Sequence, residues 1–288
     1  MNLADIPLQP GGAELLPVRG VRASQAFDNR DWVAVEVPVA LEFNGIAHAV
    51  MLATPGDLAD FALGFALGEG ILRRRGELYG IEEEYAPEGI TLKLDVASAA
   101  FARLKERRRS MAGRTGCGLC GTESLAHVAR TLPPLPPGPA LSKSAVARGM
   151  RELASLQVLQ KVTGAVHAAA WCTAKGEALL VREDVGRHNA LDKLVGALAK
   201  STLDAASGFI AVTSRASFEM VQKTVAAGVP LLAAVSASTS LATAVAQASG
   251  LTLAGFVRGD DLVIYTHPRR LNGLPANVEE VSRCTSTT

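Results

Sequence analysis

The sequence predicts two domains: an α+β domain over residues 1–132 and a three-layer α/β domain with a mixed sheet over residues 142–288. Alternating apolar runs around an Asn-Gly pair, typical of antiparallel hairpins, dominate the first part. A proline-rich stretch, 133–141, follows, and beyond it short β-rich runs alternate with helical patterns. The length of 288 residues suits two domains of ordinary size.

The first domain opens with antiparallel strands over 32–43 and 46–52, joined by the Asn-Gly turn at 44–45. Thr54 stands before a proline and three residues ahead of an acid, a helix-start signal for a helix over 58–72. The further elements expected here are a hairpin within 79–96, a basic helix over 100–111 and a short helix over 123–131.

The proline-rich stretch 133–141 is the predicted linker, because proline fixes φ and lacks a backbone donor. The alternation beyond it implies a mixed sheet covered by helices. The expected helices cover 142–161 and begin again at 188, 217 and 239, and the expected strands cover 162–171, 178–183, 208–213, 231–235, 251–257 and 262–266.

The composition of the chain argues against several classes of protein. The 29 basic residues nearly balance the 28 acidic ones, so no overall field attracts nucleic acid. The chain has no signal peptide pattern and no apolar run long enough to cross a membrane, which predicts a cytoplasmic protein. Four cysteines are too few for a disulfide framework. Cys172 reads as a small buried residue and Cys284 as part of a polar tail.

Cys117 and Cys120 form a Cys-x-x-Cys motif in a glycine-rich segment, directly after a basic stretch from Arg103 to Arg114. Nearby cations, a helix N-terminus and a second cysteine each favour the reactive thiolate by lowering a thiol's pKa. The glycines remove bulk beside both sulfur atoms, which lets a large electrophile or another protein's sulfur approach. The motif therefore predicts sulfur chemistry.

Two strand-to-helix junctions, 213–217 and 236–240, carry hydroxyl side chains and free backbone donors. One interpretation is ordinary helix capping, and the other is phosphate binding by Ser214 and Arg215. A third junction, 182–193, crowds acidic and basic residues around Arg187 and His188. His188 suits either acid–base work and polar-ligand binding or a structural hydrogen bond.

Five separated blocks together resemble the formate dehydrogenase accessory sulfurtransferase family, over about 36–271. These blocks are Gly113–Gly121, Val166–Trp171, Glu183–Lys193, Thr213–Lys223 and Tyr265–Pro268. The resemblance implies a second domain similar in fold to cytidine deaminases. It also implies a homodimeric sulfur carrier that accepts persulfide sulfur from a cysteine desulfurase on Cys117. The carrier then passes the sulfur to the molybdenum cofactor before the cofactor enters formate dehydrogenase.

The resemblance further implies that the bis guanine dinucleotide form of the cofactor binds to the second domain as a substrate. The segment that matches the family's cofactor-binding segment is Phe256, Val257, Arg258, Gly259, Asp260 and Asp261. Compared family members end this segment in glycine and a basic residue, whereas this chain has two aspartates there.

Three other functions compete with the sulfur carrier. A structural zinc site lacks its other two ligands, since no second cysteine pair or close histidine pair occurs, and the deaminase His-x-Glu and Pro-Cys-x-x-Cys pattern is absent. A thioredoxin-like reductase places its motif just after a strand, whereas a basic helix precedes Cys117 here. A non-catalytic escort of the nucleotide cofactor stays open.

Overall fold

The computed structural model describes residues 12–112, 132, 134–136 and 138–275. Its N-terminal part contains a four-stranded sheet of order β4-β3-β6-β5, in which β3 and β6 run parallel and the two hairpins are antiparallel. The elements are β3 (Val37–Phe43), β4 (Ile46–Ala53), β5 (Leu78–Ala86) and β6 (Gly89–Val96), with helices α1 (Leu58–Gly68) and α2 (Ser98–Ala112) and the short 3-10 helix η2 (Arg75–Glu77). Alternate residues of β3 are buried with apolar residues of both helices in one cluster, so α1 and α2 cover one face of the sheet.

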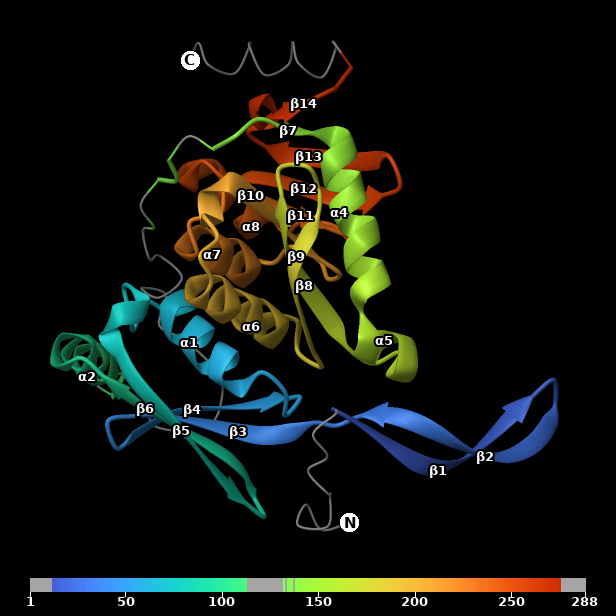
Figure 1. Cartoon of the computed structure of the whole chain (residues 1–288), viewed down its shortest axis with the longest axis vertical. Helices are drawn as coiled ribbons and strands as arrows, with labels where there is room; N and C mark the ends of the chain where they lie inside the picture. Colours follow the sequence, from blue (N-terminus) through green and yellow to red (C-terminus); the bar gives the residue numbers. More distant parts are fainter. Residues whose placement is uncertain (1–11, 113–131, 133, 137, 276–288) are drawn as a thin grey trace.

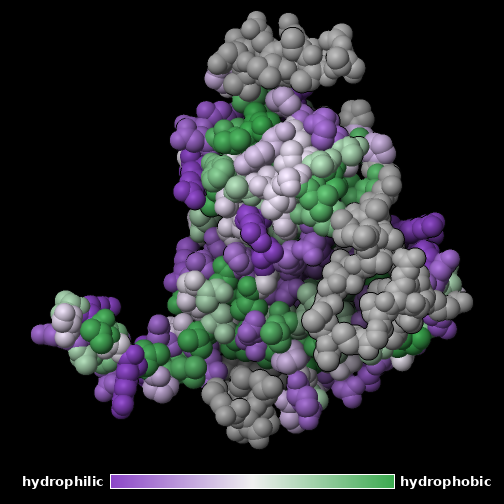
Figure 2. Space-filling view, turned by 180° about the vertical axis from the view of Figure 1, so that it is seen from behind, coloured by the Kyte–Doolittle hydropathy of each residue, from purple (hydrophilic) through white to green (hydrophobic). Residues whose placement is uncertain are grey.

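A hairpin arm precedes this sheet and projects away from the body of the molecule (Figure 1). It consists of β1 (Ala13–Arg22) and β2 (Gln25–Ala34), paired along their full length. The ring of Phe27 lies over Gly20, where a Cβ would meet it at 2.3 Å. Figure 2 shows the arm, at the left of that view, with hydrophobic and hydrophilic side chains intermingled. The single strand expected over 32–43 is two strands in the structure, because β2 ends at Ala34 and β3 begins at Val37. Strand β1 was not expected.

The second part is a three-layer α/β structure around a mixed six-stranded sheet of order β13-β12-β11-β10-β8-β9, as predicted. Strands β10, β11 and β12 are parallel, and the others are antiparallel to their neighbours. The strands are β8 (His167–Thr173), β9 (Ala178–Asp184), β10 (Gly208–Val212), β11 (Leu231–Ala234), β12 (Thr252–Arg258) and β13 (Asp261–Thr266).

Helices cover both faces of this sheet (Figure 1). Two apolar clusters, one on each face, hold them in place. On one face lie α6 (Arg187–Lys200), α7 (Phe218–Ala226) and α8 (Ser240–Ser249), and on the other α4 (Lys143–Leu156), which leads into α5 (Val158–Thr163). The remaining short elements are β7 (Leu141–Ser142), β14 (Leu271–Asn272) and the 3-10 helices η3 (Ala205–Ser207) and η4 (Pro268–Arg270).

Helices α1 and α6 join the two parts in direct backbone contact. A Cβ on Gly64 would lie 1.7 Å from the carbonyl oxygen of Asp192, and one on Gly196 would lie 1.9 Å from that of Asp60. Only glycine allows this approach. Helix α6 is consequently enclosed, with the sheet on one side and α1 on the other (Figure 1).

Several element boundaries differ from the expectation. The strand expected over 162–171 begins only at His167, because residues 158–163 form α5. The helix predicted over 142–161 is interrupted at Gln157, where α4 ends and α5 begins. The helix predicted over 58–72 ends at Gly68, and its cap position is Asp57, without a side-chain capping bond. Thr54 is not the cap, because its side chain is engaged by the second part of the chain.

The division into domains at 133–141 stays a prediction. Leu132 and Leu135 both pack against the apolar cluster beneath α6, α7 and α8, so this stretch follows the surface of the second part. No helix within the described part of the chain combines the length and apolar character needed to cross a bilayer.

Candidate functional site at one edge of the six-stranded sheet

The predicted ligand-binding residues gather at one edge of the six-stranded sheet. Because β10, β11 and β12 are parallel, their carboxyl ends meet at the same edge, where ligands bind in open α/β sheets. The antiparallel pairing of β8 brings its first residue, His167, to this edge, next to Asp184 at the end of β9. Helices α6, α7 and α8 all begin here (Figure 1), and their N-terminal backbone donors carry partial positive charge.

The two hydroxyl-rich junctions lie side by side. Ala216 and Ser238 form a parallel bridge, and the Thr239 amide donates to the Ala216 carbonyl at 3.2 Å. Thr239 caps α8 through its side chain, which confirms the capping interpretation for that junction. Ser217 occupies the cap position of α7 but makes no capping bond, and its buried hydroxyl has no partner among the described residues. The first junction thus keeps an unused polar group.

Arg187 and His188 occupy the first turn of α6 beside this junction. The His188 Nε2 atom lies 2.5 Å from Oε2 of Glu219, in the first turn of α7. The Nε atom of Arg187 is buried without a hydrogen-bond partner among the described residues. Burial lowers the pKa of His167, and the nearby charges of Arg187 and His188 lower it further. The edge therefore combines unpaired donors with a cluster of basic side chains, an arrangement suited to an anion.

The segment predicted to bind the cofactor forms the end of β12, the turn after it and the first residue of β13. Phe256 has a φ of 52° and is exposed, and its amide donates to the Ser236 carbonyl at the end of β11. Val257 is buried in the cluster beneath α4, so only its backbone is placed to meet a ligand. Arg258 and Asp261 are cross-strand partners flanking the turn between β12 and β13. Gly259 and Asp260 form that turn.

Three other charged residues of block 183–193, Asp184, Asp192 and Lys193, point toward the first part of the chain, whereas Glu183 accepts from the amides of Leu159 and Gln160 in α5. Lys193 and Asp184 are completely buried, with Lys193 Nζ and Asp184 Oδ2 2.6 Å apart. The ammonium group also donates to the carbonyl and hydroxyl oxygens of Thr54, and the Asn189 amide donates to the Leu52 carbonyl. Burial lowers the pKa of Lys193 despite the opposing charge of Asp184. These groups hold the two parts of the chain together.

A second buried ion pair reinforces this contact. Lys223 of α7 bonds both carboxylate oxygens of Asp192, at 2.8 and 3.0 Å, and Glu69 at the end of α1. Burial alone would lower the pKa of Lys223, but the charges of Asp192 and Glu69 outweigh it and raise the pKa. Arg182 similarly bonds Asp60 of α1 at 2.7 Å. Block 183–193 therefore has two separate roles: some of its charged residues hold the two parts of the chain together, and Arg187 and His188 lie at the strand edge.

The cysteine motif, Cys117 and Cys120, lies outside the described residues, as does Cys284. Cys172 is buried between the sheet and α4, and burial raises the pKa of its thiol to about 12, with a smaller contribution from Glu152. It is therefore a packing residue, as expected. Within the described ranges, no group of three or more His, Cys, Asp and Glu side chains is arranged to hold a metal ion.

Sequence reasoning missed the partners that give these residues their roles. Glu219 pairs with His188, and Thr54 and Glu69 reach the second part from the first. Glu219 lies within a block used for the resemblance, so its position in a helix's first turn was an available signal. No local pattern marks Thr54 or Glu69, because their partners are more than a hundred residues away.

The fold and the motif blocks define a family. Residues 34–272 match the family described as FdhD/NarQ. Since this match spans most of the chain, the chain belongs to the FdhD/NarQ family.

Two relatives show how far the similarity extends. A protein of Variovorax paradoxus named "Sulfur carrier protein FdhD" is 88% identical over 96% of this chain and 100% of its own length. One of the same name from Bordetella petrii is 55% identical over 91% of this chain and 94% of its own length. A crystal structure described as a formate dehydrogenase accessory protein from Desulfotalea psychrophila is similar with a TM-score of 0.71 and 22% identity, covering 90% of this chain and 99% of that one. That likeness supports the fold.

Proposed function

We propose that this protein is a sulfurtransferase that takes persulfide sulfur from a cysteine desulfurase and delivers it to the molybdenum cofactor before the cofactor is inserted into formate dehydrogenase. The observation that carries the proposal is the 88% identity, over nearly the whole chain, to a protein named as a sulfur carrier. The Cys-x-x-Cys motif after a basic stretch supplies the chemistry that this role needs. The protein acts in the cytoplasm as a homodimer.

Transfer of sulfur from the desulfurase to Cys117 needs no external oxidant. The Cys117 thiolate attacks the outer sulfur of the donor's persulfide, and the donor's own sulfur leaves as a thiolate, so that Cys117 carries the persulfide. In the transfer to the cofactor, the cofactor would supply the electron pair of the new bond to the outer sulfur and so be oxidised by two electrons, while the S–S bond breaks and Cys117 leaves as a thiolate. Alternatively, Cys120 attacks the inner sulfur of the Cys117 persulfide. Sulfide then leaves, and the two cysteines are oxidised to a disulfide.

The edge formed by the ends of β10, β11 and β12 is the proposed binding site of the cofactor. The bis guanine dinucleotide form carries two pyrophosphates, which need several cationic or amide donors. Helices α6, α7 and α8 begin at this edge, with Arg187 and His188 in the first turn of α6 and Arg215 in the loop before α7. Ser214 follows β10 in the same loop and is buried, with its hydroxyl donating to the Arg215 carbonyl, and the segment from Phe256 to Asp261 borders this edge. The likeness of this sheet to cytidine deaminases stays a prediction.

Mass spectrometry of the intact protein tests the carrier role, after incubation with a cysteine desulfurase and cysteine. We expect one added sulfur atom on Cys117, lost on treatment with a reductant. The variant Cys117→Ala should gain no sulfur and should no longer support formate dehydrogenase maturation, whereas the matched control Cys172→Ala should behave as the parent protein. The variant Cys120→Ala, which cannot close a disulfide with Cys117, should keep the added sulfur; if it gains none, the protein is a redox protein instead. Full maturation by Cys117→Ala would identify a cofactor escort.

A further inference from the structure

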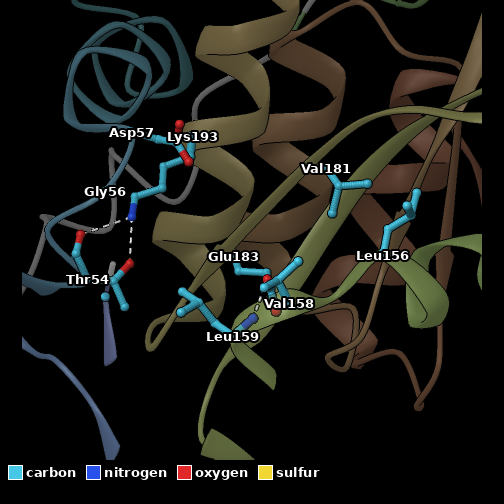
Figure 3. Close-up of a pocket in the computed structure, with 10 residues that line it drawn as sticks. Thr54, Gly56, Asp57, Leu156, Val158, Leu159, Val181, Glu183 and Lys193 are labelled. Carbon is cyan, nitrogen blue, oxygen red and sulfur yellow. Dashed lines mark hydrogen bonds between the residues drawn. The ribbon is translucent and has the colours of Figure 1, made fainter. Parts of the chain in front are cut away.

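A cavity of about 420 Å³ lies between the two parts of the chain, and its lining includes none of the residues proposed to bind the cofactor (Figure 3). Its lining comes from the base of the arm, the loop before α1, the junction of α4 and α5, strand β9 and α6. The volume falls in the range of ordinary ligand pockets, which commonly form where two structural units meet.

The cavity has walls of different chemistry (Figure 3). One wall is aliphatic and consists of Leu156, Val158, Leu159 and Val181. The facing side is polar, with the loop carrying Asp57 and the side chain of Lys193. An occupant of this space needs both an apolar stem and a polar head group.

The charges in the lining favour a cationic head group. Glu183 accepts hydrogen bonds from the Leu159 and Gln160 amides but has no ion-pair partner among the described residues. Asp57 is about half exposed and lies 3.5 Å from Arg182. Lys193 donates to both Thr54 oxygens and pairs with Asp184, so its ammonium group has no donor left for an anion. The carboxylates of Glu183 and Asp57 therefore line the cavity, and Lys193 has no N–H left to bond either of them. Arg182, near Asp57, also bonds Asp60.

The rim of the cavity points to a peptide segment as the occupant. Val158 is 68% and Leu156 45% exposed, and Val162 and Leu179 on the adjoining α5 and β9 are exposed as well. A small amine inside the cavity would leave these side chains in water, whereas a peptide would cover them. Strand β9 is an edge strand, but the Val181 carbonyl accepts from the guanidinium of Arg182, which disfavours recognition by strand addition.

We propose that this cavity is a docking site for a segment of a partner protein that presents a lysine or arginine between aliphatic residues. The basic side chain enters along the aliphatic wall, with its head group toward Glu183 and Asp57. The flanking aliphatic residues cover Leu156 and Val158. This site is independent of the proposed sulfur transfer, because it uses none of the residues assigned to that reaction.

Fluorescence anisotropy at low salt tests the proposal with the labelled peptide acetyl-Ser-Leu-Leu-Lys-Leu-Val-Ser-Gly. A second peptide with norleucine in place of lysine keeps the aliphatic stem and removes the charge. We expect the norleucine peptide to bind about tenfold more weakly, since a charge-assisted contact contributes on the order of 1.5 kcal/mol.

Three variants locate the binding. Val158→Asn, at the rim, removes apolar contact without adding charge, and Asp57→Asn, in the polar wall, removes a carboxylate; each should weaken binding of the lysine peptide by about tenfold. The matched control is Val50→Asn, because Val50 is similarly exposed, at 65%, but lies on β4 outside the cavity. It should leave the affinity unchanged, and circular dichroism should show that all three variants are folded.

Three results would overturn the proposal. Equal affinity for the lysine and norleucine peptides would show that the positive charge does not contribute to binding. An equal loss of binding in Val50→Asn and Val158→Asn would place the peptide elsewhere. Displacement of the peptide by n-butylamine at the peptide's own concentration would identify a small amine as the occupant. None of these results bears on sulfur transfer, which the persulfide experiment measures separately.

Discussion

Two regions share the stretch 183–193 but bury its charged side chains to different degrees. One is the contact between α1 and α6, and the other is the strand edge where α6 begins. At the contact, Asp184 and Lys193 are completely buried and paired. At the edge, the side chain of His188 is 25% exposed and that of its partner Glu219 is 45% exposed. The Nε atom of Arg187 has no partner among the described residues. The two regions are separated by only a turn or two of helix.

This difference shows that burial decides what a charged side chain can do. A buried ion pair must find its partner within the protein, because an unpaired buried charge costs several kcal/mol. A half-buried group beside a helix N-terminus keeps the capacity to bind something from solution. The contact should therefore respond to mutation through stability, and the edge through ligand affinity.

The largest effect is expected for Lys193→Met, which breaks the buried pair and leaves Asp184 without its counter-ion. The free energy of unfolding should fall by about 3–5 kcal/mol. Urea denaturation followed by circular dichroism measures it.

The control makes the same substitution on the same helix, at Lys200. The side chain of Lys200 is 41% exposed and pairs with Asp60, which also keeps Arg182 as a partner. Lys200→Met should cost less than about 1 kcal/mol. Equal losses at the two lysines would show that the buried pair does not hold the two parts together.

A smaller loss is expected for Gly196→Ala. The added methyl group would meet the backbone of Asp60 at 1.9 Å, and a helix backbone cannot move aside as a flexible side chain can. The cost should be about 1–3 kcal/mol, measured by the same denaturation experiment. Gly80→Ala is the control, because no atom lies within 4 Å of its added Cβ, and it should change stability by less than about 0.5 kcal/mol. An unchanged Gly196→Ala protein would contradict the close helix contact.

At the edge, Arg215→Ala should leave stability within about 0.5 kcal/mol of the parent and weaken binding of a guanine nucleotide by about tenfold. Calorimetric titration with guanosine diphosphate measures the affinity, and adenosine diphosphate is the control ligand. His188→Gln, which keeps a hydrogen-bonding side chain, should weaken binding less. Equal weak binding of both nucleotides by the parent protein would remove the assignment of this junction to phosphate.

The smallest effect concerns Cys172. Because burial raises the pKa of its thiol to about 12, the group stays protonated throughout the neutral range and is a poor nucleophile there. Iodoacetamide should leave Cys172 unmodified in the folded protein between pH 7 and 9 and should modify it in urea. Tryptic mass spectrometry identifies the site, and Cys117 is the internal reference. Rapid native alkylation of Cys172 would contradict its buried position.

Local patterns predicted much of the fold. The Asn-Gly turn between β3 and β4, the hairpin of β5 and β6 and the alternation from β8 to β13 follow from periodicity and turn chemistry, which act over a few residues. The break between β2 and β3 was missed, because alternation continues across it. Thr54 was predicted to be a helix cap. The sequence does not show that its hydroxyl accepts from Lys193 and that its amide donates to Asp184.

The sequence by itself determined most of the elements from β3 onward, their order, the Cys-x-x-Cys motif and the residues that follow β10 and β11. The tertiary structure alone decided which charged residues of block 183–193 are buried against the first part of the chain and which lie at the strand edge. Their partners, such as Thr54 for Lys193 and Glu69 for Lys223, lie 139 and 154 positions away. Helical periodicity specifies a face of α6, but only packing against α1 and the sheet specifies what that face meets.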